Sequence, residues 1–410
     1  MKIQYLAPHA FYVERGTPIS VDYMMQSLSD LGHDVELCVY REGETRRYDR
    51  VTIHRAGYPK RLGSIGPGFS VKKLIADVWL IKKAWSVHRR TKPDIIHAGE
   101  EMVFIAMLFK RLFGTPYVYD MDSSLAQQLV EKKAYLRPLS RFFKWCEARA
   151  IRGAEACAPV CNALGDLAQE AGAKRVVVLH DISQLADPDR AATGSLRKQL
   201  DIPEGRPILM YVGNLEPYQG VELLLRGYAQ AVERGVDADL VIVGGSDDDI
   251  ADYRARVIAR ELTGRVHVIG RWPADQLDEI LAEADILTAP RTQGINTPQK
   301  IFPYMHSGRP VLLTDLTTHN QVVDSSICML ADPTPEAFAE AIAKLAETPE
   351  LRARLGAAGR AFVEADFTYE AHCRRMTELY DGLTLASASS ASESAPPPLN
   401  PPAPASPDGA

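Results

Sequence analysis

The segment from Ala289 to Lys300, APRTQGINTPQK, places many anion-binding groups close together. A guanidinium, hydroxyls, amides, a glycine and an ammonium occupy these positions at the start of a predicted helix, and they belong to Arg291, Gly294, Asn296, Thr297 and Lys300. Such groups are what holding a diphosphate and sugar hydroxyls requires. A merely solvated polar loop is the alternative. We favour a binding loop because the apolar run at 301–305 directly after it must pack and so fixes its end.

Two other junctions between a strand and a helix carry candidate binding residues. The run YVGNLEPYQG at 211–220 offers Asn214, Glu216 and Gln219. The run ERGTP at 14–18 contains Gly16, which would let backbone N–H groups approach an anion at a helix N-terminus. That run is neither G-x-G-x-x-G nor a phosphate loop with its Lys-Ser/Thr, so a plain turn before a helix explains it equally well.

Elements that would position these loops alternate along the chain. Near-continuous apolar runs predict buried strands at 2–7, 34–40, 94–98, 116–120, 208–213, 238–245, 266–270, 284–290 and 310–314. Apolar residues at helical spacing predict helices at 21–32, 70–90, 103–114, 221–235, 248–264, 273–284 and 297–308. Apolar strands separated by amphipathic helices favour an α/β fold with parallel sheets covered on both faces.

The polar segment 183–207, which contains Pro and Gly and precedes a new strand, predicts a boundary between two doubly wound, Rossmann-like domains facing across a cleft. We assign 1–185 to an N-terminal domain, 186–368 to a C-terminal domain and 369–385 to a final helix. The Pro, Ala and Ser of 386–410 predict a disordered tail. Ligands of such sheets bind beyond the carboxyl ends of the strands, so we expect the site between the domains.

Charge is divided unevenly along the 410 residues. The net charge is −6, but residues 1–185 carry +7 and the remainder carries −13. In the first half Lys and Arg are interleaved with Trp and Phe between residues 72 and 152, a mixture that suits a peripheral surface on anionic lipid. The alternative is that the aromatic side chains face the core and the cations form a solvated rim.

The cysteines and the hydropathy of the chain indicate the cellular compartment of the protein. Six scattered cysteines form no C-x-x-C pair and have no histidine at metal-ligand spacing, which is typical of reduced thiols. The first residues contain too short an apolar run for a signal peptide, and no segment reaches the length of a membrane span. We therefore expect a cytoplasmic protein, with possible peripheral contact at the inner face of the membrane.

The sequence resembles the family-4 glycosyltransferases, which have two Rossmann-like domains in the GT-B fold. KPDIIHA (92–98) is similar to the family's D-V-V-H-A strand, and YVGNLEPYQGVELLL to its Y-x-G-R-L-x-x-x-K-G strand, loop and helix. The stretch 270–315 is similar to the donor-binding loop and the helix that ends S/A-x-G-x-P-V. The resemblance covers nearly all of the chain ahead of the tail.

Departures from the family's pattern fall at the donor site. Asn214 and Gln219 stand where many members have Arg and Lys. The family's Glu-x7-Glu pair falls near Ile295 or Asn296 and on Pro303. The cations of the 289–300 loop are Arg291 and Lys300, so we assign to them the neutralisation of the leaving diphosphate.

Tyr117-Val-Tyr-Asp-Met-Asp-Ser-Ser is similar to the end of the family's P-x-V-x-T-x-H-D strand, with Asp122 where a histidine often faces the donor sugar. A carboxylate there could bind donor hydroxyls or the acceptor. Asp120-Met-Asp122 also spells D-x-D, the metal-binding signature of the other major glycosyltransferase fold. That fold has one Rossmann-like domain rather than two, so we do not expect a divalent metal.

The resemblance implies a retaining glycosyltransferase that moves a hexosyl group from a nucleotide sugar to a saccharide or lipid-linked acceptor in cell-envelope or exopolysaccharide biosynthesis. The nucleotide sugar is a co-substrate, and no other cofactor is expected. The implied catalytic residues are Lys300, Arg291 and Asp122. The implied donor-binding residues are Gly16, Asn214, Glu216, Gln219, Gly294, Asn296 and Thr297.

Two alternatives remain open. The missing Arg, Lys and Glu fit a GT-B protein that binds nucleotide sugars or acts as a scaffold without transfer. A nucleotide-sugar epimerase shares the two-domain fold, although no acid and base pair is evident for it. A dehydrogenase would need G-x-G-x-x-G with a later acid, and a nucleic-acid-binding protein would need a recognition motif or an overall basic charge.

Overall fold

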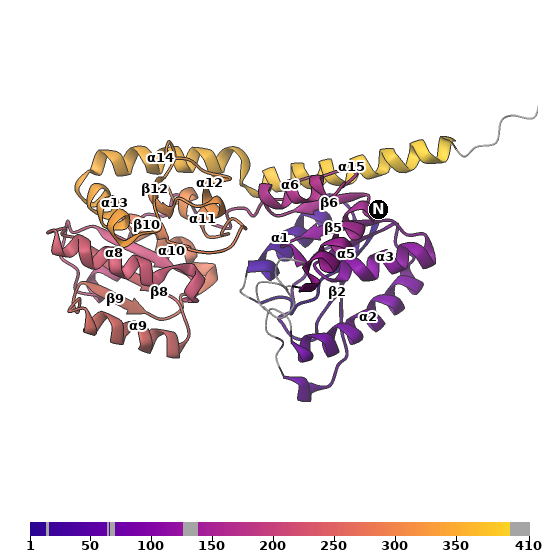
Figure 1. Ribbon diagram of the computed structural model, residues 1–410, viewed down its shortest axis with the longest axis horizontal. Helices are drawn as coiled ribbons and strands as arrows, with labels where there is room; N and C mark the ends of the chain where they lie inside the picture. Colours follow the sequence, from indigo (N-terminus) through magenta and orange to yellow (C-terminus); the bar gives the residue numbers. More distant parts are fainter. Residues whose placement is uncertain (14–15, 64, 66–69, 126–137, 394–410) are drawn as a thin grey trace, which may run out of the picture.

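The computed structural model describes residues 1–13, 16–63, 65, 70–125 and 138–393, arranged in two α/β domains (Figure 1). Within these residues no helix has the length and apolarity that a membrane span requires. Each domain contains one six-stranded sheet in which every pairing is parallel. The doubly wound α/β fold predicted from the alternation of strands and helices is confirmed.

The first sheet has the strand order β3-β2-β1-β4-β5-β6. Its strands are β1 (Lys2–Leu6), β2 (Asp34–Val39), β3 (Val51–Arg55), β4 (Ile95–Gly99), β5 (Tyr117–Met121) and β6 (Ala156–Pro159). The register places Tyr5 of β1 between Leu37 and His97 of its neighbours. The order reverses at β1 and β4, which is where α/β sheets bind ligands.

Helices cover both faces of this sheet. On one face lie α2 (Val71–Thr91), α3 (Met102–Phe113) and α5 (Ser140–Gly153), which share a core with Leu6, Ile96 and Tyr119. On the other face α1 (Gly16–Asp30) and α15 (Tyr369–Glu393) share a core with Ile3 and Tyr5. The short η1 (Lys60–Leu62) precedes α2, and α6 (Asn162–Glu170) lies beside β6.

The second sheet has the order β12-β11-β10-β7-β8-β9. Its strands are β7 (Ile208–Val212), β8 (Asp239–Val243), β9 (Val266–Ile269), β10 (Ile286–Ala289), β11 (Val311–Thr314) and β12 (Met329–Ala331). On one face lie α8 (Val221–Glu233), α9 (Asp247–Ala259) and α13 (Pro335–Glu347). On the other lie α7 (Ser195–Gln199), α10 (Leu277–Ala282), α11 (Ile301–His306) and α14 (Pro349–Asp366). Short turns complete the domain: η3 (Pro217–Gln219), η4 (Ala274–Gln276) and α12 (Thr317–Asn320).

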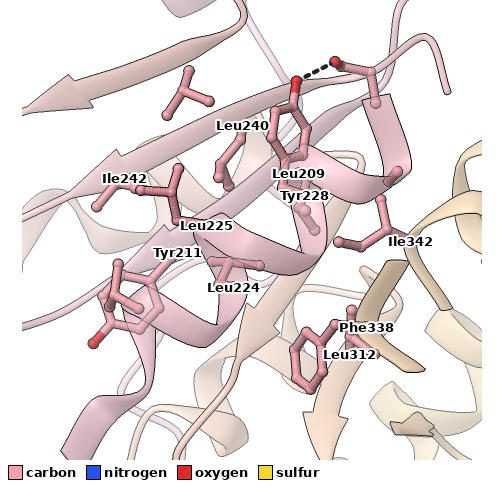
Figure 2. Packing of buried hydrophobic residues seen from close by; sticks show 14 of the residues in the cluster. Leu209, Tyr211, Leu224, Leu225, Tyr228, Leu240, Ile242, Leu312, Phe338 and Ile342 are labelled. Carbon is pink, nitrogen blue, oxygen red and sulfur yellow. Dashed lines mark hydrogen bonds between the residues drawn. The ribbon is translucent and has the colours of Figure 1, made fainter. Parts of the chain in front are cut away.

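The core around α8 shows why this domain is a firm support for a site (Figure 2). Leu224, Leu225 and Tyr228 recur at helical spacing and are fully buried. They pack against the sheet and against α13, where the partners are Leu209, Leu240, Ile242, Phe338 and Ile342. The Tyr228 hydroxyl donates a hydrogen bond to the Ala238 carbonyl at 2.6 Å, so burial leaves it satisfied.

All nine predicted strands are present, whereas the sequence did not predict β3, β6 and β12. These three are edge or near-edge strands of three to five residues. In β3 no residue is fully buried, and β6 reads ACAP. β3 and β12 are partly exposed and β6 is buried but made of small residues, so all three lack the long run of large apolar residues that reveals a central strand.

The last helix returns to the first domain. Figure 1 shows α14 over the second domain and α15 over the first, and α15 packs against α1. The Tyr380 hydroxyl of α15 forms a hydrogen bond with His97 Nδ1 of β4 at 2.7 Å. The helix runs to Glu393, past the predicted end at 385. Ala and Ser fill 386–392 without a proline before Pro396, and alanine has the highest helix propensity; residues 394–410 lie outside the described part.

Candidate functional site

The loop between β10 and α11 joins the two domains. The Asn296 side-chain amide donates a hydrogen bond to the Asp122 carbonyl at the end of β5. The Gln299 amide nitrogen lies 3.2 Å from both Ser20 Oγ and Asp181 Oδ1 of the first domain. The loop that the sequence singled out therefore lies where the carboxyl ends of both sheets approach each other.

Lys300 is held at the carboxyl end of β7. Its Nζ donates to the Tyr211 hydroxyl at 2.8 Å and lies 4.1 Å from the centre of the same ring. A Cβ at Gly213 would stand 2.3 Å from this Nζ, so the absence of a side chain at Gly213 makes room for the ammonium. Burial, assisted by the charge of Arg291, lowers the pKa of Lys300 to about 7.

Arg291 lies on the same side of the second domain. Its Nε donates to the Gln293 carbonyl at 2.7 Å, and its guanidinium lies 5.3 Å from the centre of the Tyr218 ring. A Cβ at Gly294, whose φ is +102°, would stand 2.5 Å from an Arg291 nitrogen. Burial lowers the pKa of this guanidinium, which remains charged because arginine titrates far above neutral pH.

Neither cation has an anionic partner: among the residues that the structure describes, no carboxylate forms an ion pair with Arg291 or Lys300. Other arginines of the second domain do have such partners, as Arg206 has in Asp239 at 3.2 Å. A buried charge is costly unless it is paired. Two half-buried, unpaired cations close together are therefore prepared to bind an anion with more than one charged oxygen.

A buried histidine lies behind the two cations. His319 of α12 is fully buried, with Nδ1 at 2.9 Å from the Thr314 carbonyl and Nε2 without a partner in the described part of the chain. Burial, together with the charges of Arg291 and Lys300, lowers the pKa of His319 to about 4. The imidazole is thus neutral at pH 7, and no sequence pattern drew attention to it.

The 211–220 loop packs beside the first loop. Thr292 donates its N–H to the Tyr218 carbonyl at 3.0 Å. Gln219 is buried, whereas Asn214 and Glu216 are exposed, and the Glu216 N–H donates to Asn214 Oδ1 at 3.4 Å. The Thr297 hydroxyl is buried and has no partner among the described residues.

The first domain contributes a hollow at the carboxyl ends of β1, β4 and β5. It is small, with a volume of about 10 Å³, enough for about one water molecule, and its lining includes Tyr5, His9, Thr17, Glu100, Asp120 and Asp122. Burial, together with the charges of Asp120 and Glu100, raises the pKa of Asp122 well above its usual range. A protonated Asp122 would donate a hydrogen bond rather than accept one.

The first aspartate of the Asp-x-Asp pair is held by hydrogen bonds inside the first domain. Asp120 accepts a hydrogen bond from the Tyr5 hydroxyl at 2.5 Å, and His97 Nε2 lies 3.5 Å from the same oxygen. Within the described ranges there is no group of three or more His, Cys, Asp or Glu residues that could hold a metal ion. These contacts explain Asp120 as an internal hydrogen-bond acceptor of the first domain.

Comparison with known proteins assigns the chain to a family. Residues 15–181 match the family described as "Glycosyl transferase 4-like domain", and residues 193–362 match "Glycosyl transferases group 1". The chain is a family-4 type glycosyltransferase with the GT-B fold. The resemblance seen in its motifs is thereby confirmed, as is the assignment as an enzyme.

Individual relatives are distant from this glycosyltransferase. Alpha-D-kanosaminyltransferase of Streptomyces kanamyceticus is 25% identical over 292 residues, which cover 69% of this chain and 74% of the relative. Sucrose-phosphate synthase of Thermosynechococcus elongatus is similar in structure, with a TM-score of 0.76 and 19% identity over 94% of this chain and 99% of that one. Anabaena Alr3699/HepE in complex with UDP and glucose has a TM-score of 0.71 and 16% identity, covering 93% and 99% of the two chains.

The glycosyltransferase brings most of its sequence-predicted site residues together. Arg291, Gly294, Asn296, Thr297 and Lys300 share one loop, and Asn296 reaches the backbone of Asp122. Gly16 begins α1 and faces Gln299, whose Oε1 would be 3.7 Å from a Cβ at Gly16. Glu14 and Arg15 of the same run lie outside the described residues. Residues that the sequence did not single out are Tyr211, Gln299, Asp181 and His319.

Proposed function

We propose that this glycosyltransferase moves a hexosyl group from a nucleotide sugar to a saccharide or lipid-linked acceptor in cell-envelope or exopolysaccharide biosynthesis, with retention at the anomeric carbon. The observation that carries the proposal is the unpaired pair of cations, Arg291 and Lys300. A nucleotide sugar supplies the diphosphate that such a pair would bind. UDP and glucose in the Anabaena neighbour support a donor of this class.

The proposed chemistry depends on charge that develops on the leaving diphosphate. Lys300 and Arg291 would stabilise that charge, in a setting where burial strengthens the interaction. Asp122, across the interface, would hydrogen-bond donor or acceptor hydroxyls beside the hollow of the first domain. Gly16 would offer its N–H, and Gln219, Asn214, Glu216, Gly294, Asn296 and Thr297 would contact the nucleotide and sugar. The acceptor would attack from the face that the diphosphate leaves.

We further propose that the enzyme needs no divalent metal and works in the cytoplasm, at the inner face of the membrane when the acceptor is lipid-linked. Its six cysteines are free thiols, as is usual in a reducing compartment. The two cations would take the place of a metal ion against the diphosphate. Turnover that is unchanged by EDTA would support this part of the proposal, and turnover abolished by EDTA and restored by Mn²⁺ or Mg²⁺ would overturn it.

The decisive experiment is a thermal-shift screen of nucleotide sugars, followed by release of the nucleoside diphosphate with acceptors of each class. A bound donor raises the apparent melting temperature as its saturation rises. Lys300→Ala should weaken donor binding and turnover by at least about tenfold, equivalent to about 1.4 kcal/mol. Lys198→Ala changes an exposed lysine of the same domain and should leave both within about twofold. The configuration of the product, read by NMR, tests retention.

Other outcomes separate the alternatives. Donor binding without turnover for any acceptor would favour a scaffold protein. Interconversion of the free donor without an acceptor would favour an epimerase. A change of less than about twofold in Lys300→Ala would remove the assigned role of that residue.

A further inference from the structure

Three neighbouring helices of the first domain expose many large apolar side chains. Trp85 of α2 contacts the rings of Phe109 and Phe113 of α3, and α3 packs against α5. Of the thirteen large apolar residues exposed in the described part of the chain, twelve lie on these helices or at their caps; they are Val71, Leu74, Ile75, Val78, Trp85, Phe104, Leu108, Leu112, Phe113, Leu139, Phe142 and Trp145. Exposed apolar surface of this extent marks an interaction site.

The same three helices carry positive charge and no exposed negative charge. Their exposed cations are Lys72, Lys82, Arg89, Arg90, Arg111, Arg141, Lys144, Arg149 and Arg152. Their two acidic residues, Asp77 and Glu147, are buried. Lys82 lies over the ring of Trp79 at 4.8 Å and Arg149 over that of Trp145 at 5.3 Å, so cations and aromatic rings are interleaved. We call these exposed residues of α2, α3 and α5 the α2–α3–α5 face.

We propose that the α2–α3–α5 face binds an anionic lipid bilayer, with its apolar side chains in the interfacial region and its cations against the headgroups. Apolar docking of a protein partner would require the exposed apolar side chains but not the cations around them. The absence of exposed acids over three helices is instead complementary to a uniformly negative surface, to which each added cation contributes. Figure 1 shows α2 and α3 on the side of the first domain away from the second domain, so a bilayer there leaves the second domain unobstructed.

The face borders the hollow of the first domain. Lys73 of α2 forms ion pairs with Glu100 at 3.4 Å and with Glu101 at 2.5 Å, and Glu100 lines the hollow. Lys73 is flanked in sequence by Val71, Leu74 and Ile75, which are exposed apolar residues of the α2–α3–α5 face. A bilayer on this face would thus contact the turn of α2 that is ion-paired to the lining of the hollow. This step deepens the proposed function, on which it rests, because it favours a lipid-linked acceptor that enters from the membrane.

Flotation with vesicles tests the surface directly. The full-length protein should float with vesicles of equimolar phosphatidylcholine and phosphatidylglycerol, and remain free with vesicles of phosphatidylcholine alone. Raising the salt from about 0.05 M to about 0.5 M should lower the partition coefficient by more than tenfold, because the Debye length falls to a few ångströms. A protein that stays free of anionic vesicles at the low salt concentration would overturn the proposal.

Two matched pairs of variants locate the contact. Lys82→Glu with Lys144→Glu should lower the partition coefficient at least about tenfold, since each cation near the headgroups contributes to binding. Lys198→Glu with Lys344→Glu changes the net charge equally at exposed sites of the second domain and should change it by less than about twofold. Phe142→Ser, at a ring that is 55% exposed, should lower it about threefold or more, whereas Ile258→Ser, 66% exposed on α9, should not.

Other outcomes of these experiments also test the role of the α2–α3–α5 face. If both double charge-reversal variants lost vesicle binding equally, net charge would explain the binding, and the α2–α3–α5 face would not be the contact surface. A dimer in light scattering that Phe142→Ser makes monomeric, without vesicle binding, would assign the face to a second copy of the chain. Thermal shifts with nucleotide sugars, measured on the same variants, should equal those of the wild type. Vesicle binding without any donor binding would leave the face standing and remove the proposed function.

Discussion

Gln299 of the second domain donates a hydrogen bond to Asp181 of the first, across 3.2 Å. Asp181 also accepts hydrogen bonds from Ser20 Oγ at 2.6 Å and from the Tyr23 hydroxyl at 2.8 Å. Burial raises the pKa of Asp181, while these donors act in the opposite direction. Gln299 directly precedes Lys300, so the contact that ties the domains together shares a turn with the proposed diphosphate-binding ammonium.

Gln299→Glu should separate the domains, because it places a second carboxylate against Asp181. Like charges in contact cost several kcal/mol, so we expect turnover to fall at least about tenfold and the radius of gyration to increase. Small-angle X-ray scattering measures the second effect. The control is Gln230→Glu, since Gln230 also donates to a carboxylate, Glu336 at 3.0 Å, but within one domain. Identical scattering curves for the wild type and Gln299→Glu would contradict the prediction.

The sequence was sufficient for the architecture because the central strands are buried on both faces. Runs such as ILMYV (208–212) and LVIV (240–243) are almost wholly apolar, as expected of strands in a parallel sheet that is covered on both faces. The extent of α15 and its position on the first domain were not predictable. They depend on packing against α1 and on the contact between His97 and Tyr380, which are 283 residues apart.

The site was predictable in its loops and not in its contacts. The residue types of 289–300 indicate anion binding wherever the loop lies. That Lys300 meets Tyr211, 89 residues earlier, depends on how β7 and β10 pair in the sheet. His319 and Asp181 likewise become relevant only through tertiary structure, because neither stands in a motif. Asn214 and Glu216 were singled out by position in a motif, and their exposed side chains leave their role a prediction.

Donor affinity should decrease as the pH rises through about 7. The pKa of Lys300 is lowered to about 7, and an anion binds its protonated form. Affinity is then highest below pH 7 and falls by up to about tenfold per pH unit above it, as one proton must be taken up. Calorimetric titration of a nucleotide sugar from about pH 6 to about pH 8.5 measures this. Lys300→Arg keeps its positive charge over this pH range, so its donor affinity should not depend on pH in this way. Equal pH profiles for the wild type and Lys300→Arg would refute the prediction.

Gly294→Ala should weaken donor binding more than it weakens folding. The new Cβ would stand 2.5 Å from the Arg291 guanidinium, which must move, and the backbone keeps φ at +102°. Gly235→Ala is the control, because Gly235 has φ of +91° and nothing within 4 Å of a new Cβ. Both should lose about 1 kcal/mol of unfolding free energy from backbone strain. Only Gly294→Ala should raise the dissociation constant of the donor, by about fivefold or more; an equal effect in both would place Arg291 outside the binding site.

Stability should fall as the pH is lowered from about 6.5 to 4, partly through His372. This residue is fully buried on α15, its ring lies 4.8 Å from that of Tyr23, and neither nitrogen has a partner in the described residues. Burial lowers its pKa to about 4, so the folded state excludes a proton that the unfolded chain binds below about pH 6.5. The free energy of unfolding is therefore unaffected by His372 above about pH 6.5, and it falls by about 1.4 kcal/mol per pH unit between about pH 6.5 and pH 4. Urea denaturation at several pH values should show a shallower loss for His372→Phe, which keeps the ring contact, than for the same change at half-buried His33. Parallel curves for His372→Phe and the wild type would show that this imidazole does not titrate with unfolding.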